Sequence, residues 1–330
     1  MKRREFMAVL GAALAAPAVI SAQGRASLEA LLDEAKVHPQ LRAIAIWQEG
    51  REVTARGYNG FTPDRPTNIK SASKSIISAL TGIAISRGFL SGTDQLIAPL
   101  MKADLPRDPD PRLAQVTLGN LLSMQAGLAR QSVPNYGRWV SSPNWVRAAL
   151  AAPFEQDPGG TMQYSTASTH LVSAILTRVT GRPTISLAND WLGRLPRFSV
   201  TSWQQDPQGI YLGGNEMAMS TRSLLAFGAA YAAGGAGVIP PEWIAESWTR
   251  RTSSIFNGQD YGYGWFISST GGRDVRFGWG YGGQMIYVFP ATDGLKPVAI
   301  AMTSDANQPS ARTGYREELH TLAGRLVQEL

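Results

Sequence analysis

Cysteine is absent from this chain of 330 residues. Thiol nucleophiles, disulfides and cysteine-ligated metal sites are therefore excluded. Histidine is scarce: the chain holds only His38, His170 and His320, each in an ordinary helical or loop pattern. We interpret all three as structural or surface residues rather than catalysts. We accordingly predict no metal centre and no cofactor.

Charge of either sign is also sparse. Only 17% of the residues are charged, whereas 44% are hydrophobic, which is ample for a large core in one or two domains. The net charge is +6, and residues 2–5, with three basic side chains and one acidic, supply +2 of it, leaving +4. Because the basic residues form no further run, the composition does not indicate a nucleic-acid partner.

The first residues differ in composition from the rest. A basic tripeptide at residues 2–4 precedes an apolar run from 7 to 20, and polar sequence follows. Since this run is shorter than a bilayer requires, we interpret residues 1–22 as a cleaved export signal and not as a permanent membrane anchor. Residues 3–7, Arg-Arg-Glu-Phe-Met, resemble a twin-arginine signal, with an ordinary secretory signal as the alternative. Both place the mature protein outside the cytoplasm, and we expect the periplasm.

Strand-like segments lie near both ends of the chain, with helical patterns between them. The expected strands cover residues 41–47, 52–58, 261–267, 284–289 and 297–303. The expected helices cover about 71–87, 121–124, 167–180, 184–192, 220–233, 241–249 and 312–330. This order predicts an α/β (α+β) fold in one domain, residues 23–330. Its antiparallel sheet would come from about 40–68 and 255–330, flanked by helices, with a mostly helical region of about 69–254 inserted.

Ser71 and Lys74 form the first candidate for chemistry. Residues three apart lie one turn above each other on a helix, so the hydroxyl and the amine converge. A serine hydroxyl becomes an effective nucleophile only beside a group that takes its proton. By itself the spacing is weak evidence for a catalytic pair. The alternative interpretation of Lys74 is a surface lysine in a first helical turn.

Further motifs follow this pair in order. They are Val-Thr-Leu-Gly-Asn-Leu-Leu-Ser-Met-Gln-Ala-Gly-Leu at 116–128, Pro-Gly-Gly-Thr-Met-Gln-Tyr-Ser-Thr at 158–166, Tyr-Gly-Tyr-Gly-Trp at 261–265 and Gly-Tyr-Gly-Gly-Gln at 280–284. Together with Ser-Ala-Ser-Lys at 71–74, they resemble the serine β-lactamase and penicillin-binding-protein superfamily. Their order and spacing are similar to its class C β-lactamase-like branch, which includes esterases, D-alanyl-D-alanine carboxypeptidases and 6-aminohexanoate-dimer hydrolase. The resemblance covers nearly the whole mature chain and implies the fold just described.

The resemblance implies a role for each matching residue. Ser71 would be the nucleophile that accepts the acyl group, with Lys74 and Tyr164 as the general base and acid. A nearby ammonium favours a phenolate, so either Tyr164 or Lys74 is a candidate for the initial base. The oxyanion hole would consist of the backbone N–H groups of Ser71 and Tyr281, where neighbouring glycines permit close approach.

Two departures from the family pattern bear on the substrate. Where β-lactamases carry Lys-Thr-Gly, this chain has Trp279-Gly280 or Tyr281, so the cation that holds a substrate carboxylate is missing. Thr166 stands in place of the asparagine of the Tyr-x-Asn motif. Both changes argue against efficient β-lactam hydrolysis. The form of the turn with Gly280 and Gly282 is most similar to 6-aminohexanoate-dimer hydrolase, which acts on linear amides and esters.

Several substrate contacts are expected around this centre. Thr166, Gly280 and Gly282 belong to the motifs themselves, and Tyr136 falls where the branch places a substrate-contacting tyrosine, with a structural loop aromatic as the alternative. For the tryptophans, we favour packing for Trp265 and a site role for Trp279.

The leading hypothesis is an exported serine hydrolase that cleaves a small-molecule ester or amide through an acyl-enzyme on Ser71. The alternatives are D-alanyl-D-alanine carboxypeptidase or β-lactamase activity, and a catalytically silent binding module on the same fold. An α/β-hydrolase is rejected because the chain lacks the Gly-x-Ser-x-Gly elbow and a suitable histidine.

Overall fold

The structure is a computed structural model that describes residues 22–292 and 294–330. Apart from Ala22, the export signal predicted for residues 1–22 lies outside the described residues. Among the helices of the described ranges, none combines the length and the apolar character needed to cross a bilayer.

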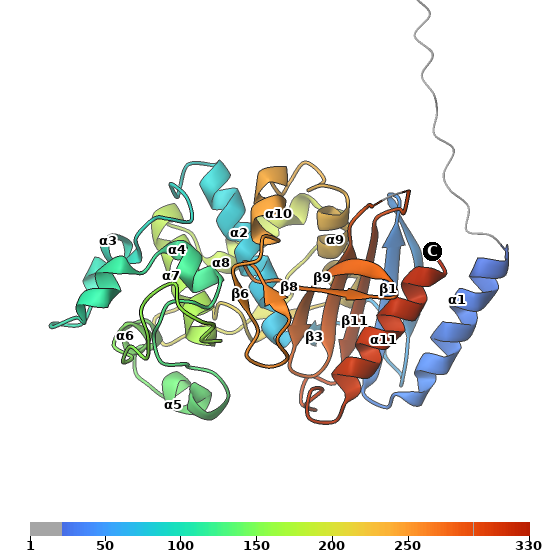
Figure 1. The fold of residues 1–330 in the computed structure, drawn as a ribbon, viewed down its shortest axis with the longest axis horizontal. Coiled ribbons are helices and arrows are strands. Elements are labelled where there is room, and N and C mark those ends of the chain that lie inside the picture. The colour runs from blue at the N-terminus through green and yellow to red at the C-terminus, as the bar shows by residue number, and fades with distance from the viewer. Residues whose placement is uncertain (1–21, 293) are drawn as a thin grey trace, which may run out of the picture.

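An eight-stranded antiparallel sheet forms the centre of the molecule (Figure 1). Its strand order is β2-β1-β11-β10-β9-β8-β7-β6, so strands from the two ends of the chain pair directly, with Ile44 opposite Met302. The strands are β1 (Leu41–Gln48), β2 (Arg51–Gly57), β6 (Thr252–Ser253), β7 (Asp260–Tyr261), β8 (Phe266–Thr270), β9 (Arg273–Gly280), β10 (Gln284–Phe289) and β11 (Val298–Ser304). The predicted α/β fold with an antiparallel sheet is confirmed.

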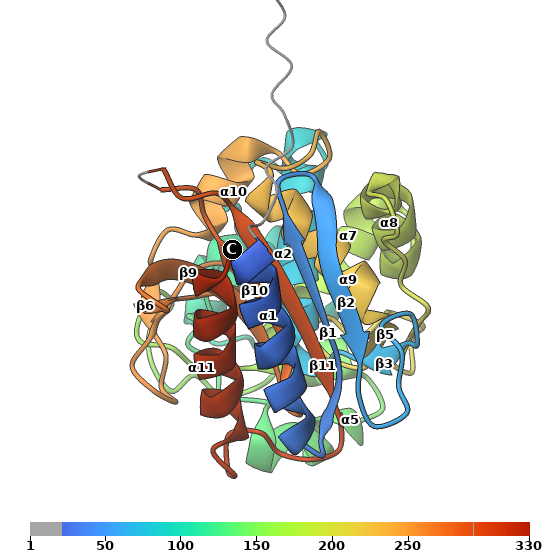
Figure 2. The same ribbon diagram turned by 90° about the vertical axis from the view of Figure 1, so that its right-hand side faces the viewer.

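Helices cover both faces of this sheet. Helices α1 (Ala22–Glu34) and α11 (Tyr315–Gln328) lie side by side on one face, as Figure 2 shows. Helices α2 (Ser73–Ser86) and α9 (Thr221–Ala232) pack on the other face. Each face has its own buried cluster, with Leu32 and Leu319 in one and Ile76 and Phe227 in the other. The sheet is therefore the middle layer of three.

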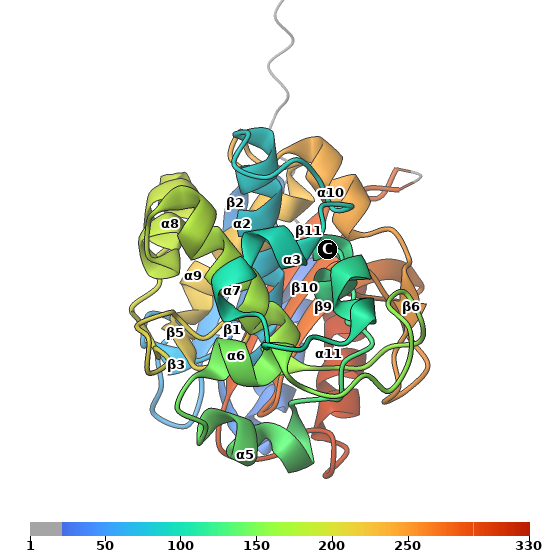
Figure 3. The same cartoon turned by 90° about the vertical axis from the view of Figure 1, so that its left-hand side faces the viewer.

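The remaining helices form a region beyond α2, seen from its outer side in Figure 3. They are α3 (Ile97–Leu100), α4 (Leu118–Leu122), α5 (Tyr136–Val140), α6 (Trp145–Leu150), α7 (Thr166–Thr180) and α8 (Thr184–Trp191), whereas α10 (Pro241–Ser247) packs against α2 near α9. A small sheet, in the order β3 (Thr67–Asn68), β5 (Met217–Met219) and β4 (Ser202–Trp203), joins this region to the segment before α2. Helix α2 is buried all round from Ser73 to Ala84, as expected for a helix with apolar or small residues on every side.

Some expectations about individual elements were wrong. The single strand predicted over 261–267 is two strands, β7 and β8, separated by a turn in which Gly264 has a φ of +78°. This turn lies against α2, because Ser75 Oγ donates a hydrogen bond to the Gly264 carbonyl at 2.6 Å. Strand β9 was not predicted, since its two arginines, its aspartate and its two glycines interrupt the apolar alternation. Helix α1 was also missed.

Candidate active site

Ser71 lies in a 3-10 turn, Lys70–Ala72, that leads directly into α2. One turn later, Lys74 Nζ is 3.1 Å from Ser71 Oγ. Lys70 precedes the serine with a φ of +50°, and its carbonyl accepts a hydrogen bond from Ser73 Oγ at 2.7 Å. The tight turn places the serine at the open end of a helix that is otherwise buried. The predicted convergence of hydroxyl and amine is present.

The amine of Lys74 is enclosed by protein, and its hydrogen-bond partners are oxygen atoms. The residue is 1% exposed, and Nζ contacts the Gly214 carbonyl at 2.7 Å and Thr166 Oγ1 at 3.3 Å. Because burial penalises the ammonium form, the pKa of Lys74 falls to about 7. A substantial fraction of this lysine is therefore an uncharged amine at neutral pH, which is the state able to accept a proton.

Tyr164 completes the group around the nucleophile. Its hydroxyl lies next to the Ser71 side chain, and Lys74 Nζ lies 5.1 Å from the centre of its ring. Burial raises the pKa of Tyr164 to about 12, and this effect outweighs the hydrogen bond from Ser71 that lowers it. The direction is opposite to the one expected from a neighbouring ammonium, because desolvation dominates both groups. Tyr164 is thus a protonated phenol, and of the two candidates Lys74 is the better base.

Thr166 contacts the amine of Lys74 from the first turn of α7. Its Oγ1 is 3.0 Å from Ser132 Oγ, and its backbone N–H donates to the same oxygen at 2.8 Å. The residue is buried. The hydroxyl predicted to meet substrate is therefore part of the polar shell that holds Lys74.

The edge of β9 approaches the start of α2 through glycines. A Cβ at Gly280 would lie 2.4 Å from the Ile69 carbonyl oxygen, and one at Gly278 would lie 2.7 Å from Ser75 Oγ. Tyr281 follows in the turn to β10, and its carbonyl accepts hydrogen bonds of 2.9 Å from both the N–H and the Oγ of Ser310. The backbone at Tyr281 is therefore held close to the helix end that carries Ser71.

Gly282 and Trp279 make further contacts that hold the turn between β9 and β10. The Gly282 N–H donates to Gln284 Oε1 at 3.0 Å, and a Cβ there would lie 2.1 Å from the Asp305 carbonyl oxygen. Since the neighbouring glycines face α2, strand alternation directs the Trp279 side chain to the α11 face. Its indole N–H donates to Ser310 Oγ at 3.1 Å.

The other predicted aromatic residues lie at different depths. Tyr136 is half-buried, and its hydroxyl accepts a hydrogen bond of 2.9 Å from Asn215 Nδ2. Trp265 is fully buried and stacks on Phe227, with 5.9 Å between ring centres. His170, the most buried histidine, pairs with Asp206 at 3.0 Å. Within the described ranges, no hydrogen bond joins a histidine to the Ser71 group.

Gly214 was missed by the sequence reading. It has a φ of +84°, and a Cβ there would lie 2.7 Å from Lys74 Cγ. Only a residue without a side chain can bring its carbonyl this close to the amine. The pair Gly213-Gly214 in a loop between predicted helices was the available signal.

A second feature that the sequence reading missed is Glu216, which holds the residue before Ser71 in place. Lys70 Nζ pairs with Glu216 Oε1 at 2.8 Å, and Asn68 Nδ2 donates to Glu216 Oε2 at 2.5 Å. Asn68 Oδ1 also accepts the Lys70 N–H at 2.9 Å. Glu216 is two residues after Gly214, so one segment contacts both the residue before Ser71 and the amine of Lys74.

Exposed aromatic side chains form the rim of the site. Phe256, from the loop between β6 and β7, is 39% exposed, and its ring centre lies 5.2 Å from that of Tyr164 and 6.1 Å from that of Trp279. Tyr281 is 50% exposed. A partly exposed aromatic ring therefore lies against Tyr164.

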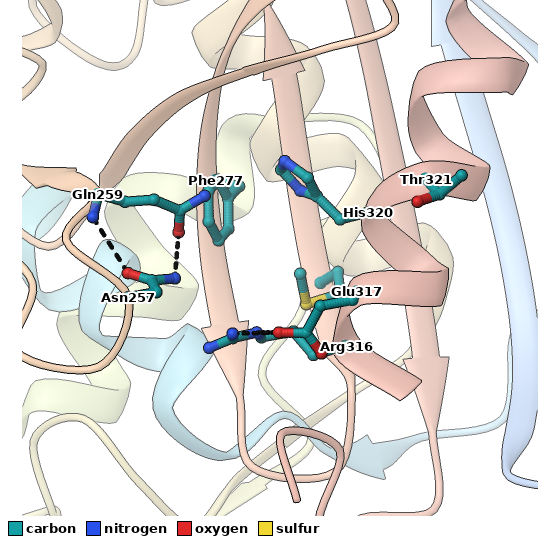
Figure 4. Close-up of a pocket in the computed structure, with 8 residues that line it drawn as sticks. Asn257, Gln259, Phe277, Arg316, Glu317, His320 and Thr321 are labelled. Atoms are coloured by element: carbon teal, nitrogen blue, oxygen red, sulfur yellow. Dashed lines mark hydrogen bonds and ion pairs between the residues drawn. The ribbon is translucent and has the colours of Figure 1, made fainter. Parts of the chain in front are cut away.

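Figure 4 shows a separate hollow of about 240 Å³ on the α11 side of the sheet. Its polar groups satisfy one another: the Asn257 side chain is hydrogen-bonded to Gln259, and Arg316 pairs with Glu317. The lining residues are Asn257, Gln259, Phe277, Met285, Arg316, Glu317, His320 and Thr321. Ser71, Lys74 and Tyr164 are not among them, so this hollow is distinct from the candidate active site.

Comparisons with known proteins agree with this geometry. The family model described as Beta-lactamase matches residues 36–325. A protein of Dichelobacter nodosus assigned to fimbrial assembly (FimD, serogroup H1) is 28% identical over 170 residues, which are 48% of this chain and 42% of that protein. The chain thus spans less than half the length of this curated relative.

Solved structures with hydrolase names share the fold. A Bacillus anthracis protein assigned as a 6-aminohexanoate-dimer hydrolase superposes with a TM-score of 0.71 at 18% identity, covering 92% of this chain and 82% of that one. EstCE1, a hydrolase with promiscuous acyltransferase activity, superposes with a TM-score of 0.71 at 16% identity, and the match covers 90% of this chain and 98% of that one. The D-amino acid amidase of Ochrobactrum anthropi SV3 superposes with a TM-score of 0.70 at 14% identity, and the match covers 93% of this chain and 98% of that one. The chain belongs to the Beta-lactamase family and has the fold of the serine β-lactamase/transpeptidase superfamily.

Proposed function

We propose that this protein is a serine hydrolase that cleaves a linear ester or amide through an acyl-enzyme on Ser71. The observation that carries the proposal is the contact of 3.1 Å between Ser71 Oγ and the Lys74 amine, whose surroundings hold its pKa near 7. A buried lysine without a carboxylate partner is costly to keep, and such groups cluster at functional sites.

The proposed reaction has two halves, acylation of Ser71 and hydrolysis of the acyl-enzyme. The uncharged Lys74 amine takes the Ser71 proton while Oγ attacks the substrate carbonyl, and the N–H groups of Ser71 and Tyr281 stabilise the oxyanion. Tyr164 donates its proton to the leaving group and regains one from the Lys74 ammonium. In deacylation, water attacks the acyl carbonyl, Lys74 accepts the proton of the water, and the Lys74 ammonium passes this proton to Ser71 Oγ as the acyl group leaves as a carboxylic acid.

The substrate class follows from what the rim offers. The positions that would supply the cation of Lys-Thr-Gly hold Trp279, Gly280 and Tyr281, which supports esters and linear amides over β-lactams. The esterase and amidase names of the structural relatives agree with this choice. Carboxypeptidase or β-lactamase activity is the competing function, and strong covalent labelling by a fluorescent penicillin would favour it.

The test compares Ser71→Ala with Ser78→Ala. Both remove a hydroxyl near or on α2, but Ser78 Oγ is buried without a hydrogen-bond partner, so its loss leaves no group unpaired. Intact mass after incubation with a fluorophosphonate should show one adduct on wild type and on Ser78→Ala and none on Ser71→Ala. Hydrolysis of p-nitrophenyl butyrate should fall by about 10³-fold or more only in Ser71→Ala. Unchanged turnover in that variant would refute the assignment.

We also propose that the protein is exported, on the basis of residues 1–22 alone. Cell fractionation of the full chain should place it in the periplasm. Replacing Arg3 and Arg4 by lysine should block export through the twin-arginine route, and export that continues would favour the ordinary secretory route.

A further inference from the structure

Arg130 differs from the other cations near Ser71. Lys70 is paired with Glu216, Arg316 is paired with Glu317, and Lys74 is the buried amine. Arg130 is half-buried, and in the described part of the chain no carboxylate lies within ion-pair distance of it. The rim therefore contains one guanidinium whose charge is uncompensated.

The position of Arg130 relates directly to the nucleophile. Its Nε donates a hydrogen bond to the Tyr164 carbonyl at 3.3 Å, and its Cζ lies 5.9 Å from the centre of the Phe256 ring. The hydroxyl of the same tyrosine lies next to the Ser71 side chain. The guanidinium thus lies against the backbone of the tyrosine whose side chain reaches Ser71, with the exposed Phe256 ring beside it.

The loop that carries Arg130 is anchored on both sides. The N–H of Gln131 donates to Ser165 Oγ at 3.1 Å, and Asn135 Nδ2 donates to the Arg130 carbonyl at 2.9 Å. A planar guanidinium on a fixed backbone is well suited to bind a carboxylate through two hydrogen bonds.

We propose that Arg130 binds a carboxylate on the leaving group, so that the preferred substrates are esters or amides whose alcohol or amine portion carries an apolar or aromatic stem ending in a carboxylate. This inference rests on the proposed function, in which Tyr164 gives its proton to the leaving group. The departing portion then lies on the Tyr164 side of Ser71, where Phe256 contacts the stem and Arg130 faces the anion.

The experiment compares two esters that share an acyl group. 4-Butanoyloxybenzoic acid carries a free carboxylate on its leaving group, and methyl 4-butanoyloxybenzoate has the same group capped. Each kcat/KM is divided by the rate of alkaline hydrolysis of that ester, which removes the difference in intrinsic reactivity. The ratio of the two values, carboxylate over capped, is the measured preference.

Wild type should prefer the carboxylate by about tenfold, a preference that weakens in concentrated NaCl because salt screens the interaction. Arg130→Gln should bring the ratio close to one, Arg130→Glu should invert it, and Arg130→Lys should keep part of it. Arg138→Gln is the matched control, because Arg138 lies in the neighbouring helix α5, is exposed and binds only Asn135 there. Its ratio should equal that of wild type.

A wild-type ratio of one or below, or an equal ratio in Arg130→Gln, would overturn the proposal. The capped ester keeps this result separate from the proposed function. If Ser71→Ala still hydrolyses the capped ester, the acyl-enzyme assignment fails. If hydrolysis depends on Ser71 and the ratio is flat, only the role of Arg130 fails.

Discussion

The site has a floor, formed by Ser71, Lys74 and the groups that contact the Lys74 amine, and a rim, formed by Phe256, Tyr281 and Arg130. These two parts are built in different ways. In the floor, the Lys74 amine has defined partners at Ser71, Thr166 and Gly214, and all of them lie in or against buried elements. In the rim, the Phe256 and Tyr281 rings are exposed, and Arg130 has no acidic partner among the described residues. The comparison indicates that the floor sets the chemistry, whereas the rim is free to set the substrate.

Replacing Lys74 by methionine should have the largest effect, because it removes the base and keeps the shape of the floor. We expect kcat/KM for p-nitrophenyl butyrate to fall by about 10³-fold. In wild type, acylation should rise with pH through about 7 and then level off, since the uncharged amine is the active form and the pKa of Lys74 lies near 7. Stopped-flow acylation rates from pH 5 to 9 measure this profile.

Stability provides an independent check on the same lysine. The pKa of Lys74 is about 7 in the folded protein against 10.5 in its ordinary state. Between these values the unfolded chain binds one more proton, so the free energy of unfolding of wild type should rise with pH by about 1.4 kcal/mol per unit relative to Lys74→Met. Urea unfolding at pH 7.5 and pH 9 tests the sign. A difference that does not change with pH would contradict the lowered pKa.

Gly280→Ala should cause the next largest loss of activity. Its added Cβ would lie 2.4 Å from the Ile69 carbonyl oxygen, so the β9 edge must move away from Ser71. Displacing one oxyanion donor costs about 10²-fold in kcat. Gly193→Ala is the control, because no atom lies within 4 Å of its added Cβ. Equal kcat values for the two variants would show that the β9 edge does not stabilise the transition state.

Glu216→Gln should lower kcat by about tenfold and leave KM nearly unchanged, because it loosens the brace on Lys70 without reaching the rim. Lys70→Met and the double variant, which carries both substitutions, complete a double-mutant cycle. If the ion pair acts as a unit, the double variant should lose little more than either single one. Additive losses would mean that the two residues act separately.

Phe256→Ala should have the smallest effect and should act on the rim alone. We expect KM for apolar esters to rise a few-fold, kcat to stay within about twofold, and the free energy of unfolding to change by less than about 1 kcal/mol, since the ring is 39% exposed. Phe89→Ala, which removes a ring 41% exposed against Trp191, should leave KM unchanged. A large fall in kcat for Phe256→Ala would place this ring in the floor.

The sequence predicted the parts of this site that depend on local spacing. Ser71 and Lys74 are one turn apart, so their approach follows from helix geometry, and the strand from Gln284 to Phe289 was predicted with its observed bounds. Fold and family are confirmed, and the roles of the site residues remain predictions. Gly214 and Glu216 were missed because they reach the site through contacts about 140 residues away in the chain.

The direction of proton transfer also required three-dimensional information. From the sequence, Lys74 and Tyr164 were equal candidates for the base. Burial acts in opposite senses on an amine and a phenol, lowering the pKa of one and raising that of the other. Periodicity shows which residues are buried, but not how completely a charged atom is removed from water.

The contact between Ser75 and Gly264 spans 189 residues. At the usual pace of protein synthesis, the turn before β8 leaves the ribosome roughly 10–40 s after Ser71 does. Throughout that interval the serine lacks the glycine edge of β9, and for most of it the Gly214 carbonyl that contacts Lys74 is also missing. A growing chain therefore carries Ser71 without its full surroundings. Under the proposed function, hydrolysis is expected only after the last third of the protein has been made and has folded back onto α2.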